Sequence, residues 1–211
     1  MKKTLYLVRH GQTDATKQHL WIGARTQFKL NEDGRDESEI AAVNLRNRNL
    51  DCNHIYTSPV ERCYQTARII QNRLLVPLTP VPNLSEMFFG DLEGVDEEIF
   101  KTDFPVQYKL WTESCTKFTP PNGESGREFL DRVVAVVTRL ATEVETKDVV
   151  IVTHSGVVKL FLAYIMEKDL EVGWRNLDVP RATTGSITRI SFDDETEKFE
   201  FIENIGSGIN G

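Results

Sequence analysis

The residues of this chain that could do chemistry stand where apolar runs end. The run Leu5–Val8 leads into Arg9 and His10, and the run Val149–Val152 leads to His154. An imidazole can act as a nucleophile or a proton carrier near neutral pH, and arginine keeps a positive charge that suits phosphoryl oxygens. These residue types indicate phosphoryl transfer with a histidine as the nucleophile.

Two strands of a parallel sheet must position these histidines. Short apolar runs of this kind are typical of strands that are buried on both faces. Open α/β sheets bind ligands just past the carboxyl ends of their strands. Gly11 and Gly156 follow closely and let the backbone turn sharply at these ends. A histidine that only caps a strand would produce the same local pattern, so the prediction depends on its recurrence along the chain.

A third basic side chain is placed near the same edge by a predicted helix. Ser58 follows a predicted strand over Cys52–Thr57, and Ser58 with Glu61 matches a capping box, so we expect a helix that runs to about Leu75. Arg62 then lies in the first helical turn. The helix dipole disfavours a cation there, which indicates an anionic ligand.

Glu86 is the carboxyl group best suited to proton transfer. It lies among apolar residues such as Leu84 and Met87. Burial raises a carboxyl pKa, so the group can donate a proton near neutrality. The sequence has no Gly-rich nucleotide loop with lysine, no His-Glu-x-x-His and no paired aspartates for Mg²⁺. A side-chain nucleophile that needs no metal and no cofactor is therefore expected.

The other predicted elements form one domain over residues 1–211, in which helices alternate with strands. The predicted helices lie over 34–48 with Ile40, Val43 and Leu45 inward, over about Arg127–Thr146 after a Ser125–Glu128 capping box, and from His154 to about Glu167. Two short helices near 96–119, with Trp111 packed between them, are expected to form a cover. The remaining strands are an edge strand between Pro77 and Pro82 and two strands near Ser186–Phe192 and Phe199–Ile205, and residues 206–211 are expected to be frayed. The class is therefore α/β, with a hairpin late in the chain.

Composition limits the partners and the compartment. The net charge of −7 argues against nucleic acid and anionic membranes. No apolar run approaches the ~20 residues of a membrane span, and the run behind Met1-Lys2-Lys3 is too short for a signal peptide. Three cysteines without metal or redox spacing favour a reducing cytoplasm. A small phosphorylated substrate stays compatible, because a basic pocket can lie within an acidic surface.

Taken together, the motifs resemble the histidine phosphatase superfamily, the clan of cofactor-dependent phosphoglycerate mutases and related phosphatases. Four motifs carry the resemblance in the family's order: Arg9-His10-Gly11, Ser58-Pro59-x-x-Arg62, Glu86 ahead of Phe89-Gly90-x-x-Glu93-Gly94, and Thr153-His154-Ser155-Gly156. The segments Leu84–Gly94 and Pro121–Ser125 are most similar to the broad phosphatase branch, which includes α-ribazole phosphatases.

The resemblance implies a three-layer α/β/α sandwich around a mostly parallel sheet, with an antiparallel strand contributed late in the chain. It also implies a metal-independent phosphomonoesterase that acts on a small phosphorylated metabolite. His10 would become phosphohistidine, and Glu86 would be the general acid and later the base. The phosphoryl group would be bound by Arg9, Arg62, a protonated His154 and the amide of Ser155.

The loop after His10 is expected to supply further substrate contacts: Gly11, Thr13, Thr16, Ile22 and Gly23. Many family members carry Asn at the position of Thr16 and Gln at that of Ile22, and both usually contact phosphate. Their loss predicts weak inhibition by phosphate and a preference for bulky or aromatic esters. His19, in the same loop, is not expected to contact the substrate.

Two other functions stay open at this point. One is mutase-type phosphotransfer at the same site. The other is a non-catalytic relative that only binds phosphate, which is disfavoured because binding has no need of Glu86. The chain is expected to act as a monomer or a homodimer.

Overall fold

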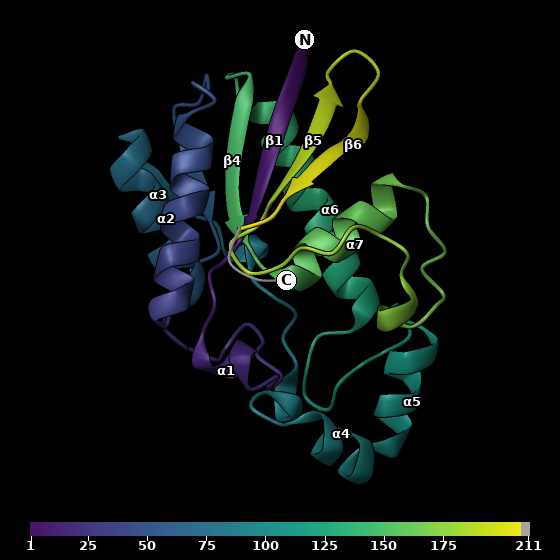
Figure 1. Ribbon diagram of the computed structural model, residues 1–211. Coiled ribbons are helices and arrows are strands. Elements are labelled where there is room, and N and C mark those ends of the chain that lie inside the picture. Colours follow the sequence, from purple (N-terminus) through teal and green to yellow (C-terminus); the bar gives the residue numbers. More distant parts are fainter. Residues whose placement is uncertain (208–211) are drawn as a thin grey trace.

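A computed structural model describes residues 1–207 and arranges them around one sheet (Figure 1). The strand order is β3-β2-β4-β1-β5-β6. The strands are β1 (Lys2–Arg9), β2 (Ile55–Thr57), β3 (Leu78–Pro80), β4 (Asp148–Thr153), β5 (Ile187–Asp193) and β6 (Lys198–Ile205). Among these, β5 alone is antiparallel to its neighbours β1 and β6, and the other pairs are parallel. The predicted mostly parallel sheet with a late antiparallel strand is confirmed.

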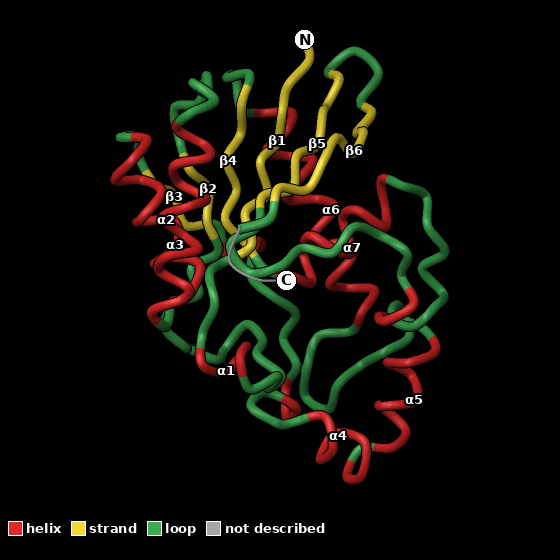
Figure 2. Tube along the Cα trace, viewed as in Figure 1, coloured by secondary structure: helices red, strands yellow, loops and turns green. Residues whose placement is uncertain are grey.

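The alternation of side chains along β1 divides the core into two parts. Leu5 and Leu7 pack into one cluster, and Tyr6 and Val8 pack into the other. The first cluster includes α6 (Gly126–Glu143) and α7 (Ser155–Ile165), and the second includes α2 (Glu32–Arg46) and α3 (Glu61–Leu74). Helices therefore cover both faces of the sheet, as Figure 2 shows, and the three-layer sandwich is confirmed.

The smaller helices gather beyond the carboxyl ends of β1 and β4 (Figure 1). They are α1 (Asp14–Lys17), α4 (Glu97–Asp103), α5 (Pro105–Glu113) and the 3₁₀ helices η1 (Pro82–Leu84), η2 (Gly90–Leu92) and η3 (Trp174–Asn176). Trp111 of α5 does not pack between α4 and α5 as predicted. Its ring centroid lies 4.6 Å from that of Trp21 and 4.8 Å from that of Trp174.

The inward face predicted for α2 was partly wrong. Val43 is 41% exposed, whereas Ala41 and Ala42 are buried together with Leu45. The buried Ser38 extends the same face by one helical turn. Small side chains let α2 approach α3 closely, so the face is defined by small residues that a search for bulky apolar side chains overlooks.

Ser58 does not cap α3. The helix begins at Glu61 after Val60, and it has no side-chain cap. The Ser58 hydroxyl instead lies 2.8 Å from Nε2 of His154. The predicted capping box fails because β2 ends at Thr57 and three residues separate it from the helix. The second predicted box, formed by Ser125 and Glu128 at the start of α6, is present.

Other expectations differ only at the ends of elements. The strand predicted over Cys52–Thr57 begins at Ile55, and the helix predicted to reach Thr146 ends at Glu143. The predicted frayed end falls outside the described residues from residue 208 onward. Within residues 1–207, no helix is both long and apolar enough to cross a membrane.

Candidate active site

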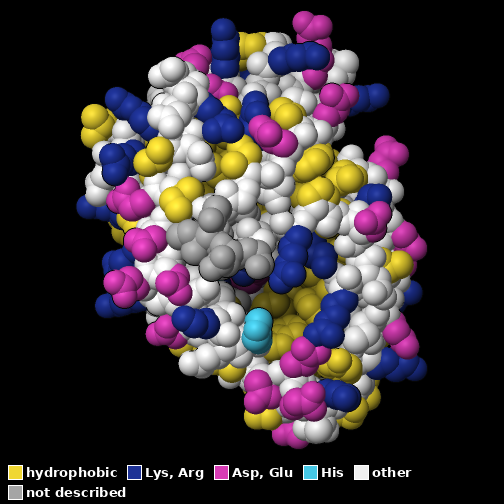
Figure 3. All heavy atoms as spheres, in the orientation of Figure 1, with side chains coloured by type: hydrophobic (Ala, Val, Ile, Leu, Met, Phe, Trp, Pro, Cys, Tyr) yellow, Lys and Arg dark blue, Asp and Glu magenta, His cyan; other side chains and the backbone are white. Residues whose placement is uncertain are grey.

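A cavity of about 350 Å³ opens beyond the carboxyl ends of β1 and β4. Figure 3 shows it as a hollow with an apolar floor, with basic side chains and one histidine at its rim. Of the residues predicted to act in catalysis, His10, Arg9, Glu86 and Ser155 line it. Strand ends that are far apart in the sequence thus converge on one space, as the topology requires.

His10 presents a reactive nitrogen. Its Nδ1 lies 2.8 Å from the carbonyl oxygen of Gly11, so Nδ1 carries the proton and Nε2 keeps its lone pair. That lone pair accepts a hydrogen bond from Nε of Arg62 at 3.1 Å. Burial, with the charges of Arg62 and Arg9, lowers the pKa of His10 well below its usual value. The imidazole is therefore neutral, the form that a nucleophile needs.

Arg62 lies fully buried behind His10, and its guanidinium is held on every side. Its Nη1 and Nη2 donate to the carbonyl oxygens of Thr26 and Gly23, each at 3.0 Å. Gly11 and Gly23 thus position His10 and Arg62 through their backbone carbonyls. Neither they nor Thr13 line the cavity, so the structure does not place these three expected contacts against a substrate there.

His154 is held in the opposite tautomer. Nη2 of Arg62 donates to its Nδ1 at 3.0 Å, so its Nε2 carries the proton and donates to Ser58 Oγ at 2.8 Å. Burial and the charge of Arg62 lower its pKa well below the usual value. In the free protein these surroundings favour the neutral form of His154, and protonation of His154 with a phosphoryl group bound stays a prediction. His154 is fully buried and reaches the site from behind His10, at 5.3 Å between ring centroids.

Arg9 brings an unsatisfied donor to the cavity wall. Its Nη1 donates to the carbonyl oxygen of Ala182 at 2.8 Å. Its buried Nε has no hydrogen-bond partner among the described residues. Burial lowers the pKa of Arg9 to about 10, so it stays charged at neutral pH. A buried donor without a protein partner is suited to an oxygen of a bound anion.

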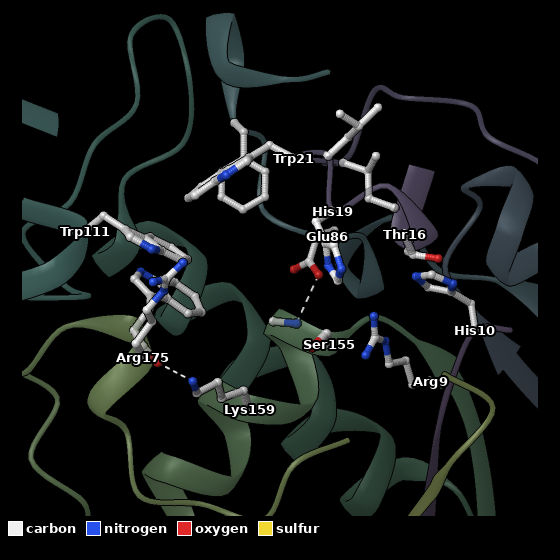
Figure 4. Close-up of a pocket in the computed structure, with 15 residues that line it drawn as sticks. Arg9, His10, Thr16, His19, Trp21, Glu86, Trp111, Ser155, Lys159 and Arg175 are labelled. Carbon is white, nitrogen blue, oxygen red and sulfur yellow. Dashed lines mark hydrogen bonds between the residues drawn. The ribbon is translucent and has the colours of Figure 1, made fainter. Parts of the chain in front are cut away.

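Glu86 is 8% exposed and lines the same cavity as Arg9 and Ser155 (Figure 4). Its Oε2 accepts from the amide of Gly156 at 3.0 Å, and its Oε1 accepts from the Met87 amide at 3.1 Å. Burial raises the carboxyl pKa, although these hydrogen bonds oppose the change. A Cβ on Gly156 would lie 2.2 Å from Oε1, so only glycine permits this contact. A buried carboxyl group with a raised pKa is suited to donate a proton near neutral pH.

The residues of this site run from Arg9 to Gly156, and the match to known proteins extends farther along the chain. Residues 5–205 match the family model described as the histidine phosphatase superfamily, branch 1. The chain belongs to the histidine phosphatase superfamily. The sequence-based predictions of this family, and of an enzyme of the phosphoric monoester hydrolase class, are confirmed.

Similar proteins include both phosphatases and mutases. The adenosylcobalamin/alpha-ribazole phosphatase of Salmonella typhimurium is 31% identical over 162 residues, which cover 77% of this chain and 79% of that protein. A 2,3-bisphosphoglycerate-dependent phosphoglycerate mutase of Bartonella bacilliformis is 36% identical over 137 residues, or 63% of this chain and 66% of the mutase. The solved structure of Bacillus stearothermophilus YhfR superposes with a TM-score of 0.84 at 26% identity, over 99% of this chain and 98% of YhfR.

The Glu86 segment is held by a half-buried ion pair that the sequence did not reveal. Arg132 of α6 donates from Nε and Nη2 to the two carboxylate oxygens of Glu124, at 2.8 and 2.7 Å. Its Nη1 donates to the carbonyl oxygens of Asn83 and Ser85, at 2.8 and 2.9 Å, and Nη2 also reaches that of Glu86 at 3.3 Å. One arginine thus ties Glu124, within the Pro121–Ser125 motif, to the backbone that carries the proton donor.

Thr16 and Ile22 line the cavity, as expected for the two positions where this histidine phosphatase departs from its family. The Thr16 hydroxyl donates to the carbonyl oxygen of Thr13 at 2.8 Å and accepts from the Thr13 amide at 2.8 Å, within the capping box of α1. Thr16 therefore has little capacity left for a ligand. His19 also lines the cavity, contrary to the expectation that it stays out of contact.

The far wall of the cavity comes from segments whose role could not be recognised in the sequence. It is lined by Trp21, Phe89, Trp111, Lys159, Trp174 and Arg175, among others. These residues come from the loop after α1, from α5, α7 and η3, and from the segment before η2. The one available sequence signal was that Lys159 follows Ser155 by a single helical turn, which places both on the same side of α7.

Proposed function

We propose that this protein is a metal-independent phosphomonoesterase that hydrolyses small phosphorylated metabolites through phosphohistidine at His10. One observation carries the proposal. The Nε2 lone pair of a neutral His10 lies beside a cavity that also holds Arg9 and a buried Glu86 whose pKa is raised. Nucleophile, anion donor and proton donor thus share one space. Phosphatases among the similar proteins support the same reaction class.

In the first step, His10 Nε2 attacks phosphorus and the bond from phosphorus to the ester oxygen breaks. Nε of Arg62, which donates to this lone pair in the free protein, turns to the phosphoryl oxygens. The unsatisfied Nε of Arg9 is a second donor. Glu86 passes its proton to the departing alcohol oxygen. The charge that builds on the equatorial oxygens is stabilised by fixed donors in a buried site.

In the second step, water releases the phosphoryl group. Glu86, now ionised, accepts a proton from the attacking water. At the same time the water oxygen bonds to phosphorus, and the bond from phosphorus to His10 Nε2 breaks. Phosphate leaves, and Glu86 is again protonated. A raised pKa serves both steps, because the group must exchange a proton near neutral pH. A mutase would exclude this water and return the phosphoryl group to another hydroxyl.

The test is to mix the protein with [³²P]phosphate monoesters, quench in base and locate the label. We expect base-stable, acid-labile label on His10, release of inorganic phosphate, and unchanged turnover in excess EDTA. Loss of activity in EDTA that Mg²⁺ or Zn²⁺ restores would overturn metal independence. Isomerisation of 3-phosphoglycerate, primed with a bisphosphate, that outruns phosphate release would favour the mutase.

The proposal extends to the compartment and the assembly. We assign the protein to the cytoplasm, a choice supported by three cysteines that form no disulfide. The substrate is a small phosphorylated molecule, and the protein acts as a monomer or a homodimer. Sedimentation at micromolar concentration would separate the two assembly states.

A further inference from the structure

The cavity continues well past the reacting groups, and we propose that its far end binds a second anionic group of the substrate through Lys159. The substrate class is then a phosphate monoester whose alcohol has a flat apolar body and, at its far end, a carboxylate or a second phosphate. The inference rests on the proposed function for the position of the phosphoryl group.

Lys159 is a cation with no acidic partner among residues 1–207. It lies on α7 four residues after Ser155, so the helix carries it about 6 Å farther along the cavity wall. Its ammonium donates to the carbonyl oxygen of Trp174 (Figure 4). No carboxylate within residues 1–207 lies in ion-pair reach of it. An ammonium has three donors, so two remain for an anion.

The neighbouring charges leave this end of the cavity positive. Arg175 also lines the wall, but it is paired with Glu97. Burial lowers the pKa of Lys159, while Cys115 opposes this shift and repulsion by Arg181 adds to it. Arg181 repels Arg9 as well, so its field reaches both ends of the cavity. A partly buried cation without a counterion is costly, and a ligand anion would remove that cost.

Aromatic side chains line the cavity near Lys159, whose ammonium donates to the carbonyl oxygen of Trp174. The rings of Trp111 and Trp174 are stacked, with centroids 4.8 Å apart and an angle of 17° between planes. Trp21 meets Trp111 edge-on at 4.6 Å. Indole faces of this kind favour an aromatic or other flat apolar group.

The experiment measures binding of three phosphonates, which contain no cleavable ester bond. They are benzylphosphonate, 4-carboxybenzylphosphonate and the neutral isostere 4-carbamoylbenzylphosphonate, titrated by calorimetry into the full-length protein. We expect the acid to bind about 10-fold more tightly than the amide, from one charge-assisted contact. In Lys159→Met, which keeps the aliphatic stem, the ratio should fall to about 1 with benzylphosphonate affinity unchanged. Lys159→Arg should keep the preference, and so should the control Lys198→Met on the distant strand β6.

Each outcome decides the inference. Equal affinity of acid and amide in the wild type overturns it, and so does a preference that survives Lys159→Met. If Lys159→Met no longer binds benzylphosphonate, Lys159→Gln is used in its place, and its ratio of acid to amide affinity should likewise fall to about 1. Hydrolysis of 4-nitrophenyl phosphate is assayed separately. If neither the wild type nor any variant hydrolyses 4-nitrophenyl phosphate, the proposed hydrolysis fails. The second-anion site still stands in that case if the wild type prefers the acid over the amide and the preference depends on Lys159.

Discussion

The ends of β1 and β4 lie side by side and carry the same sequence pattern, yet they hold their histidines in opposite ways. The backbone carbonyl of Gly11 fixes the proton of His10 on Nδ1 and leaves Nε2 for attack. Arg62 donates to Nδ1 of His154, which leaves its Nε2 proton bound to Ser58. Hydrogen-bond partners, more than position at a strand end, therefore decide which histidine reacts.

The two strand ends also differ in which side chains they present to the cavity. The β1 end exposes His10 and Arg9 to the cavity, whereas His154 at the β4 end is fully buried. The β4 end instead supports the proton donor, because the Gly156 amide binds Glu86. In the proposed mechanism the β1 end supplies the nucleophile, and the β4 end positions the proton donor. Five measurements can test this difference between the two strand ends.

Replacing the two histidines one at a time should give the largest contrast. His10→Ala removes the nucleophile, so we expect turnover of 4-nitrophenyl phosphate to fall by roughly 10⁴-fold or more. His154→Ala removes a fixed polar group behind it, and we expect a loss of about 10²-fold. Steady-state rates and base-stable labelling check both, with label lost only in His10→Ala. Equal losses, or label retained in His10→Ala, would contradict the assignment.

Glu86→Gln should slow alkyl phosphates by roughly 10²–10⁴-fold and 4-nitrophenyl phosphate far less, because nitrophenolate needs little protonation. In the wild type, the rate on alkyl phosphates should decline as pH rises through the raised pKa of Glu86. Gly156→Ala should show a milder form of the same dependence on leaving group, since its methyl group would meet Oε1. Equal losses on both substrate types would restrict Glu86 to binding or structure.

Ser58→Ala tests the support of His154 alone. The variant leaves the buried Nε2 proton without its acceptor, so we expect the free energy of unfolding to fall by about 1–3 kcal/mol. We expect kcat/KM to fall about 10-fold for the same reason, with labelling of His10 intact. Ser191→Ala, on β5, is the matched control and should change neither quantity. A fall in labelling would mean that Ser58 also serves the β1 end.

The two histidines should affect the pH dependence of the free energy of unfolding in the same way. Both have a pKa lowered by burial, so below about pH 6.5 the unfolded chain binds protons that the folded protein does not. Stability is therefore lost as pH falls from 6.5 toward the folded-state values, by up to about 1.4 kcal/mol per pH unit for each histidine. Urea unfolding between pH 5 and 7.5 measures this slope.

Variants assign the slope to residues. His10→Gln and His154→Gln should each flatten it. Glu86 acts in the opposite direction, since its pKa is raised by burial and its contribution is lost as pH rises, so Glu86→Gln should steepen the slope. A slope that neither histidine variant changes would mean that other groups control acid unfolding.

The smallest effect is expected in the loop after His10. Thr16→Asn with Ile22→Gln adds two carboxamides to the cavity wall, so inorganic phosphate should inhibit about 3–10-fold more tightly. Preference should also move from aromatic esters toward small sugar phosphates. Competitive inhibition constants measured with one substrate check the first effect. If neither the constants nor the substrate ranking changes, these positions do not face the phosphate.

The sequence alone was enough to predict a mostly parallel sheet and the placement of the candidate reacting groups at its edge, because both depend on local patterns. A buried strand requires a run of apolar residues, and a residue that follows the run must lie at the carboxyl edge. His10, Arg9 and His154 could therefore be assigned to one edge before any contact was known. The α6 capping box was equally local, since Ser125 and Glu128 satisfy each other three residues apart.

The tertiary structure decided the partners of these groups and the shape of the cavity. Ser58 has an adjacent helix to cap, yet it binds His154 across 96 residues. Arg132 holds the Glu86 segment from 46 residues away. Trp174 reaches the cavity because η3 packs against α5, and Lys159 of α7 meets it there. Hydrogen bonds and packing depend on distance in space. Because several segments of this chain return to the same sheet edge, the sequence does not determine which of their side chains become neighbours.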